Sequence, residues 1–388
     1  MRKIFIFTIL VSFVFGVPTD ELFLTTPQIL NHRNVSYERH KVVTEDGYIL
    51  SLIRIPRDDS NGVAVLQHSL SLDSAIFLVS QKRSIAMEVY NAGYEVWLPN
   101  FRGLRDSDQH TNPSIKKLDY WNFSFHEIGI YDVPAILSYV ANVTKTKLIV
   151  INHSLSSTAS LVYSSLKPKE AEGNVKVFIN LASSAFMNHT RTPLKDFTGL
   201  QYNIIKPIMD IFGWGAVFYD HAPYVQLSKE IALILLPNNL MVSVFKIASG
   251  FLFGRSGMDY DPEEFPMIVS LGTQAVCSKI LNHYAQLIES GRFCMYDYGK
   301  DENLRMYNST TPPDYPLEDI TAPTYLVISD SDSISDSWGS NVLYDQLPAA
   351  AKLYGKMDIK NVNHADYLIG KDRFVYFSKV LEFIKSIK

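Results

Sequence analysis

Three residues of this chain have the types and the order that nucleophilic catalysis by a serine requires. Ser154 follows an apolar run at 147–151, Asp332 follows another at 325–329, and His364 precedes the last helical pattern. A serine hydroxyl attacks an ester when a histidine takes its proton and a carboxylate orients that histidine. Backbone N–H groups must stabilise the oxyanion as the acyl-enzyme forms. We therefore predict a nucleophile, an acid and a base in these three residues.

The residues around Ser154 predict a sharp turn between a buried strand and a helix. Asn-His-Ser-Leu-Ser occupies 152–156, directly after the apolar run. A nucleophile elbow has this layout, with the usual pattern Gly-x-Ser-x-Gly. Here Asn152 and Ser156 stand where glycines let the turn tighten and the helix approach the strand. The alternative is that Ser154 is an ordinary helix N-cap.

The acid and the base also have alternatives. Asp330 and Asp336 lie near Asp332 in a run of serines and aspartates that could be a solvated loop. His364 could be a surface histidine between a strand and a helix. In α/β-hydrolases the order along the chain is serine, acid, histidine. The same order here favours Asp332 and His364.

Short β-branched and aliphatic runs alternate with longer helical patterns, which predicts an α/β fold with a mostly parallel central sheet flanked by helices. The predicted strands are 49–55, 62–67, 95–98, 147–151, 176–180, 325–329 and 351–356. The predicted helices between and after them include 84–92, 129–140, 156–165 and 374–387.

The alternation stops after Leu181. From 186 to 308 we predict helices and no strand. This segment is expected to form a helical cap, or lid, inserted between two parts of the core at 17–185 and 309–388. A cap with an apolar lining suits lipid chains, although ordinary core helices are the alternative for most of its residues.

The most apolar runs of the cap lie at 231–236 and 240–253. A membrane span needs roughly 20 consecutive apolar residues. Pro237 and Lys246 interrupt these runs, so we predict no transmembrane segment here.

The first 16 residues have the pattern of a signal peptide. Arg2 and Lys3 precede an apolar run that ends at Gly16. A membrane anchor is the alternative, but the run is shorter than the roughly 20 apolar residues that span a bilayer. We therefore expect secretion or delivery to a lysosome-like compartment. Five glycosylation sequons agree with that route, at Asn34, Asn122, Asn142, Asn188 and Asn308.

Composition excludes several other classes. The chain has 388 residues, a net charge of −4 and 47% hydrophobic residues, which indicates a globular protein and gives no sign of nucleic-acid binding. Its two cysteines are Cys277 and Cys294. A helix predicted at 278–291 would separate them by roughly 20 Å, and a disulfide needs Cα atoms within about 7 Å. We predict two free, buried thiols.

Several blocks resemble the acid lipases, a family of α/β-hydrolases that includes gastric and lysosomal acid lipases. The resemblance covers nearly the whole chain after the signal segment. Its most distinctive block is Tyr-Trp-Asn-Phe-Ser-Phe-His-Glu-Ile-Gly-Ile-Tyr-Asp at 120–132. The other blocks are Leu-Gln-His-Ser-Leu at 66–70, and those at 44–50, 54–56, 92–100, 102–103, 329–336 and 363–366.

The resemblance implies a role for each candidate residue. Ser154 would be the nucleophile, Asp332 the orienting acid and His364 the general base. The N–H groups of Leu70 and Leu155 would form the oxyanion hole. The implied reaction is hydrolysis of acylglycerols or sterol esters at a lipid–water interface, without a metal or another cofactor.

Two alternatives stay open, and departures from the family pattern motivate the first of them. Ser69 stands in a family glycine place, as Asn152 and Ser156 do, and a positive φ there would strain a serine by about 1 kcal/mol or more. Leu155 replaces a family glutamine, which leaves the backbone N–H in place. One alternative is a lipase-like protein that binds lipid with little catalysis. The other is an esterase or acyltransferase for small esters.

Overall fold

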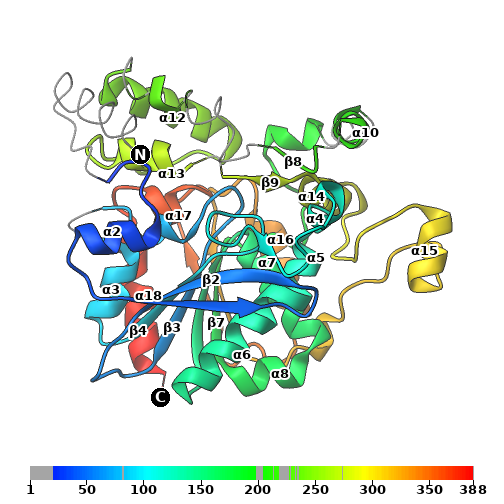
Figure 1. Cartoon of the computed structure of the whole chain (residues 1–388), viewed down its shortest axis with the longest axis horizontal. Coiled ribbons are helices and arrows are strands. Elements are labelled where there is room, and N and C mark those ends of the chain that lie inside the picture. Colours follow the sequence, from blue (N-terminus) through cyan, green and yellow to red (C-terminus); the bar gives the residue numbers. More distant parts are fainter. Residues whose placement is uncertain are drawn as a thin grey trace.

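A nine-stranded, mostly parallel sheet forms the centre of the molecule (Figure 1). The computed structural model describes residues 21–80, 83–197, 204–212, 214–217, 227, 229–231, 233, 236–272 and 274–387. Along the sheet the strands follow the order β1-β2-β4-β3-β6-β7-β10-β11, and β5 pairs with β2. The pairs β1–β2, β2–β4 and β2–β5 are antiparallel, and the pairs from β4 to β11 are parallel.

The strands are short, as the apolar runs predict. They are β1 (Glu38–Val43), β2 (Tyr48–Ile55), β3 (Val63–Gln67), β4 (Glu95–Pro99), β5 (Gln109–His110), β6 (Leu148–His153), β7 (Val175–Leu181), β10 (Thr324–Ser329) and β11 (Lys356–Ile359). A separate antiparallel pair joins β8 (Ala216–Val217) to β9 (Val276–Cys277).

Helices cover both faces of the sheet. In chain order they are α2 (Thr26–His32), η1 (Ser74–Leu78), α3 (Ile85–Asn91), α4 (Lys117–Tyr120), α5 (Phe125–Glu127), the π-helical turn η2 (Ile128–Asp132), α6 (Val133–Thr144), α7 (Leu155–Leu166) and α8 (Pro168–Asn174). They continue with η3 (Pro193–Phe197), α10 (Lys206–Ile211), α12 (Asn238–Leu252), α13 (Phe265–Leu271), α14 (Ser278–Ser290), α15 (Lys300–Tyr307), η5 (Leu317–Asp319), α16 (Ser337–Gln346), α17 (Asp366–Ile369) and α18 (Phe374–Ser386).

The central strands are buried on both sides, because successive side chains point to opposite faces of a sheet. In β3, Ala64 and Leu66 join the core beneath α3 and α18, whereas Val63 and Val65 join the core beneath α6 and α7. Near-continuous apolar runs are expected of parallel strands that are covered in this way.

Most of the predicted elements are confirmed, and the predicted α/β-hydrolase fold is confirmed with them. The strand predicted at 351–356 is wrong. Residues 351–354 form a turn, and Gly355 has a positive φ of 74°. Strand β11 therefore starts at Lys356, opposite Leu326 of β10. Strand β1 was not predicted, because its mostly exposed residues show no alternating apolar pattern.

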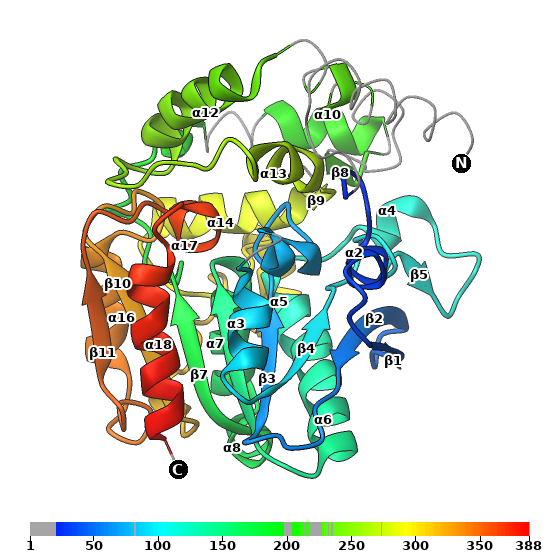
Figure 2. The same ribbon diagram turned by 90° about the vertical axis from the view of Figure 1, so that its left-hand side faces the viewer.

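The segment predicted as a cap is called the insert below (186–308). Its helices α10, α12 and α13 lie beyond the carboxyl ends of the central strands (Figure 2). The prediction that it holds no strand is wrong, since β8 and β9 pair over two residues each, too short a pairing to leave a sequence pattern. Among the described helices, none has the length and apolarity needed to cross a bilayer. The division into core and cap stays a prediction.

Other sequence predictions concern the surface and the cysteines. The signal segment at 1–16 lies outside the described residues. All five sequon asparagines are exposed, including Asn122 between buried aromatic neighbours. Cys277 and Cys294 are free and buried, as predicted, and α14 lies between them, closed by Gly291 in the left-handed conformation.

Candidate active site

Ser154 lies in the turn between β6 and α7, at the carboxyl end of a central strand. Its φ and ψ are 56° and −110°, a sparsely populated conformation for a residue with a Cβ. The Ser154 N–H donates to the carbonyl of Leu181 at 3.0 Å. This backbone geometry is the strained strand-to-helix turn that defines a nucleophile elbow.

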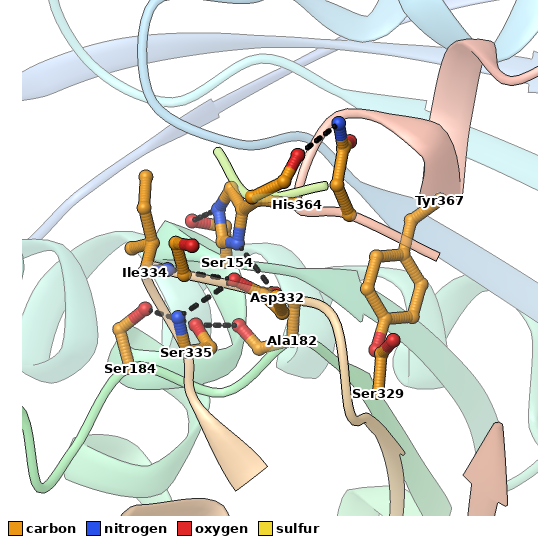
Figure 3. Close-up of polar contacts among 12 residues, drawn as sticks. Ser154, Ala182, Ser184, Ser329, Asp332, Ile334, Ser335, His364 and Tyr367 are labelled. Carbon is orange, nitrogen blue, oxygen red and sulfur yellow. Dashed lines mark hydrogen bonds and ion pairs between the residues drawn. The ribbon is translucent and has the colours of Figure 1, made fainter. Parts of the chain in front are cut away.

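His364 lies between Ser154 and Asp332, and Figure 3 shows the three side chains in line. His364 Nε2 is 2.8 Å from Ser154 Oγ. His364 Nδ1 is 2.8 Å from Asp332 Oδ2. The imidazole therefore contacts a hydroxyl on one side and a carboxylate on the other, which is the arrangement needed to take a proton from the serine.

Asp332 is fully buried and held by its own loop. Its Oδ1 accepts hydrogen bonds from the N–H groups of Ile334 at 2.8 Å and Ser335 at 2.9 Å. The two rival carboxylates face elsewhere. Asp330 accepts from the N–H of Asn361 at 2.9 Å, and Asp336 caps α16 by accepting from the N–H of Gly339 at 2.8 Å. Geometry thus favours Asp332 as the partner of His364.

Ser156 stands at a position where the family has glycine, and its hydroxyl is accommodated there by hydrogen bonds. The hydroxyl accepts from the N–H of His153 at 2.8 Å and lies 2.8 Å from the carbonyl of Gln67, to which it donates. It thereby links the turn, the helix α7 and the neighbouring strand β3.

Asn152 fits its place by pairing with the next strand. It is fully buried, and its Nδ2 donates to Asn180 Oδ1 at 2.8 Å. Gln67, Asn152 and Asn180 stand side by side in the register of β3, β6 and β7. The side chain at position 152 therefore lies in a row of buried amides across the three strands.

Ser69 does not carry the strain that a positive φ would cause. In the described loop after β3, which carries Leu70, Ser71 has a positive φ of 63° and Ser69 does not. The loop is held by the insert, because the N–H of Gln274 donates to the carbonyl of Ser71 at 3.0 Å. The family glycine is thus not required for its backbone freedom at position 69.

Leu70 and Leu155 line the same pocket. Leu155 is the first residue of α7, and the first N–H groups of a helix have no acceptor within the helix. Its N–H group is therefore available to an oxyanion, as the resemblance implies. The rest of this pocket is mainly apolar, with lining residues that include Phe101, Leu104, Trp121, Phe123, Ile128, Ala275 and Ile280.

Two buried histidines beside the site were not given roles by sequence reasoning. His68 accepts from the N–H of Phe101 at 3.1 Å, and burial lowers its pKa to about 4. His153 Nε2 lies 3.1 Å from the carbonyl of His364, and burial lowers the pKa of His153 well below its usual value. Both rings are therefore neutral. The only sequence signal for His153 is its place directly before Ser154.

Comparisons with known proteins show similarity to lipases. A family profile described as a partial alpha/beta-hydrolase lipase region matches residues 26–81. The chain is 31% identical to human lipase member K over 360 residues, which cover 89% of this chain and 86% of that protein. It is 27% identical to gastric triacylglycerol lipase of Rattus norvegicus over 370 residues, or 92% and 90% of the two chains.

Among solved structures, a soluble variant of monoglyceride lipase from Saccharomyces cerevisiae, in complex with a substrate analogue, shares the fold. Its TM-score is 0.52 at 13% identity, and the match covers 91% of this chain and 97% of that one.

Proposed function

Because this chain belongs to the acid lipase family of α/β-hydrolases, we propose that it is a secreted or lysosomal lipase that cleaves acylglycerols or sterol esters. Its relatives are named lipases, which makes it a carboxylic-ester hydrolase. The proposed catalytic residues are Ser154, His364 and Asp332. The observation that carries the proposal is the unbroken hydrogen-bond chain from Ser154 Oγ through His364 to Asp332.

The proposed reaction proceeds in two halves. His364 Nε2 takes the proton of Ser154 as Oγ attacks the carbonyl carbon of the ester, and Asp332 stabilises the imidazolium that forms. The N–H groups of Leu70 and Leu155 donate to the oxyanion. His364 then gives the proton to the departing alcohol. In the second half, water attacks the acyl-enzyme by the same route and releases the fatty acid.

A lipid substrate is supported by the apolar lining of the pocket beside Leu70 and Leu155. Burying an acyl chain against such a surface stabilises the complex by about 0.8 kcal/mol per methylene group. A long acyl chain would therefore bind more tightly than a short one, which distinguishes a lipase from an esterase for small esters.

Work at a lipid surface is supported by the outer face of α12. Leu240, Val244, Ile247 and Phe251 are exposed, and their spacing of four, three and four residues places them on one side of the helix. The side chains of Ile247 and Phe251 are 76% and 68% exposed. Apolar stripes of this kind on an otherwise polar surface mark contact with membranes or other partners.

Passage through the secretory pathway is supported by the signal pattern at 1–16 and by the exposure of the five sequon asparagines. Transfer of an oligosaccharide needs an accessible asparagine side chain, and all five of these side chains are accessible. We therefore propose that the mature protein is a glycoprotein.

The test is labelling of the secreted protein with a fluorophosphonate probe beside a Ser154→Ala variant. We expect labelling of the wild-type chain and none of the variant. Turnover of short- and long-chain esters between about pH 4 and 8, across the titration range of an ordinary histidine, identifies the substrate class. A folded wild-type protein that neither labels nor hydrolyses any ester would refute the proposal. Lipid binding by that protein would then support the lipase-like, non-catalytic alternative.

A further inference from the structure

A turn of the insert lies between the loops that carry the acid and the base. Three segments meet here, and we call them the cap turn (253–260), the acid loop (330–336) and the base loop (361–366). The carbonyl of Phe253 accepts from two N–H groups, that of Ser333 at 3.0 Å and that of His364 at 3.3 Å. One carbonyl of the insert thus joins the residue after the acid to the base itself.

The base loop is bonded to the insert at further points. The N–H of Gly257 donates to the carbonyl of Asn361 at 2.9 Å. Asn363 Nδ2 donates to the carbonyl of Gly254 at 3.1 Å and to the hydroxyl of Ser249 at 2.9 Å. The bonded residues of the base loop, Asn361 and Asn363, both lie shortly before His364 in the chain.

Asp366 anchors the other end of the base loop. This carboxylate is fully buried, and burial raises its pKa. It accepts from the hydroxyls of Ser256 at 2.5 Å and Tyr260 at 2.8 Å, both from the insert. It also accepts from the N–H of Asn363 at 2.8 Å, within the base loop. A buried carboxylate that accepts from three donors holds the cap turn and the base loop together firmly.

We propose that the cap turn is a positioning element of the triad, which holds the acid loop and the base loop at the separation that catalysis requires. This inference rests on the proposed function. Asp332 and His364 come from loops after different strands, and both backbones must be fixed for the 2.8 Å contact between their side chains. Catalytic groups need positions accurate to about 0.5 Å, which only supporting residues can provide. The insert therefore does more than cover the pocket.

Gly254 offers a way to disturb this arrangement. Its φ is +109°, and a Cβ on it would lie 2.0 Å from the carbonyl oxygen of Ser331. Alanine at this position must push the cap turn and the acid loop apart. Gly250 lies four residues earlier in α12, and a Cβ there would meet nothing within 4 Å. Gly250→Ala is therefore the matched control.

The experiment compares the wild-type chain, Gly254→Ala and Gly250→Ala as full-length secreted proteins. Folding is checked by circular dichroism and thermal unfolding, and turnover of a short soluble ester is measured well below the unfolding temperature. For Gly254→Ala we expect kcat to fall about a hundredfold, with KM within about twofold of the wild-type value. The rate of fluorophosphonate labelling of Ser154 should fall in parallel. Gly250→Ala should keep the wild-type kcat.

A folded Gly254→Ala enzyme with wild-type kcat would overturn the inference. If that variant does not fold, Tyr260→Phe decides, because it removes only the hydroxyl by which the cap turn contacts Asp366, Asn363 and Ser249. A fall in kcat of about tenfold at unchanged KM supports the inference, and an unchanged kcat overturns it. A wild-type chain that fails to label would instead refute the proposed function itself, so the two failures are distinguishable.

Discussion

The hydroxyl of Ser156 is expected to stabilise the elbow, although family members have glycine at this position. It is completely buried, it accepts from the N–H of His153, and it donates to the carbonyl of Gln67, with the carbonyl of His153 as a second acceptor at 3.1 Å. In Ser156→Ala the N–H of His153 would be buried without that partner, at a cost of about 1–3 kcal/mol, and a bond worth about 1 kcal/mol would be lost. Alanine offsets part of this through its better helix propensity. We expect the free energy of unfolding to fall by about 2 kcal/mol.

The control is Ser164→Ala on the same helix. Ser164 is also buried, but its hydroxyl donates only to the carbonyl of Ser160, one turn earlier, at 2.7 Å. Such bonds add little to helix stability, so we expect a change below about 0.5 kcal/mol. Urea unfolding, followed by fluorescence and circular dichroism, measures both variants. Ser156→Gly, which restores the family residue, should lower the free energy of unfolding by at least as much as Ser156→Ala. A Ser156→Ala protein as stable as Ser164→Ala would refute the reasoning.

Three further predictions concern the site and its surroundings. Asp332→Asn should lower kcat by about 10⁴-fold and Asp330→Asn by less than about threefold, since only Asp332 contacts His364; equal effects in ester turnover would contradict the assignment. His153→Phe removes the ring nitrogen beside the carbonyl of His364 and should lower kcat about tenfold, and His153→Gln, whose amide nitrogen reaches the same point, should restore most of it. Burial lowers the pKa of His283 to about 3, whereas an unfolded histidine titrates near 6.5. As the pH falls below about 6.5, the unfolded chain takes up a proton at this residue that the folded chain does not. The free energy of unfolding therefore falls by about 1.4 kcal/mol for each pH unit because of this residue. Urea unfolding between pH 6 and 4.5 should show a shallower loss for His283→Gln than for the wild-type chain.

The sequence was sufficient for the central strands and for the places of the three candidate catalytic residues. Each of these follows a local pattern, such as the apolar run before Ser154, that needs no knowledge of distant neighbours. Strand β11 was misplaced, because an edge strand with partly exposed residues has no apolar signature. Its start depends on Gly355 and on pairing with β10.

The effect of the lost glycines could not be predicted from the sequence. Asn152 finds its partner Asn180 on the next strand, and Ser156 finds Gln67 on another. These partners lie 28 and 89 residues away along the chain, so no local window contains them. The bonds from the insert to the base loop were missed for the same reason, although Asn363 and Asp366 belong to a block that resembles the family.

The distances along the chain between the partners of the site bear on how the protein is made. His364 and Ser154 are 210 residues apart, and His364 and Asp332 are 32 apart. A ribosome adds about 5–20 residues per second, so the serine emerges well before its base has been synthesised. Contacts of such long range also form late in folding. A nascent chain that has not yet reached His364 therefore cannot contain an assembled triad. Esterase activity would report that β11 and the loop that carries His364 have been synthesised and have docked onto the rest of the sheet.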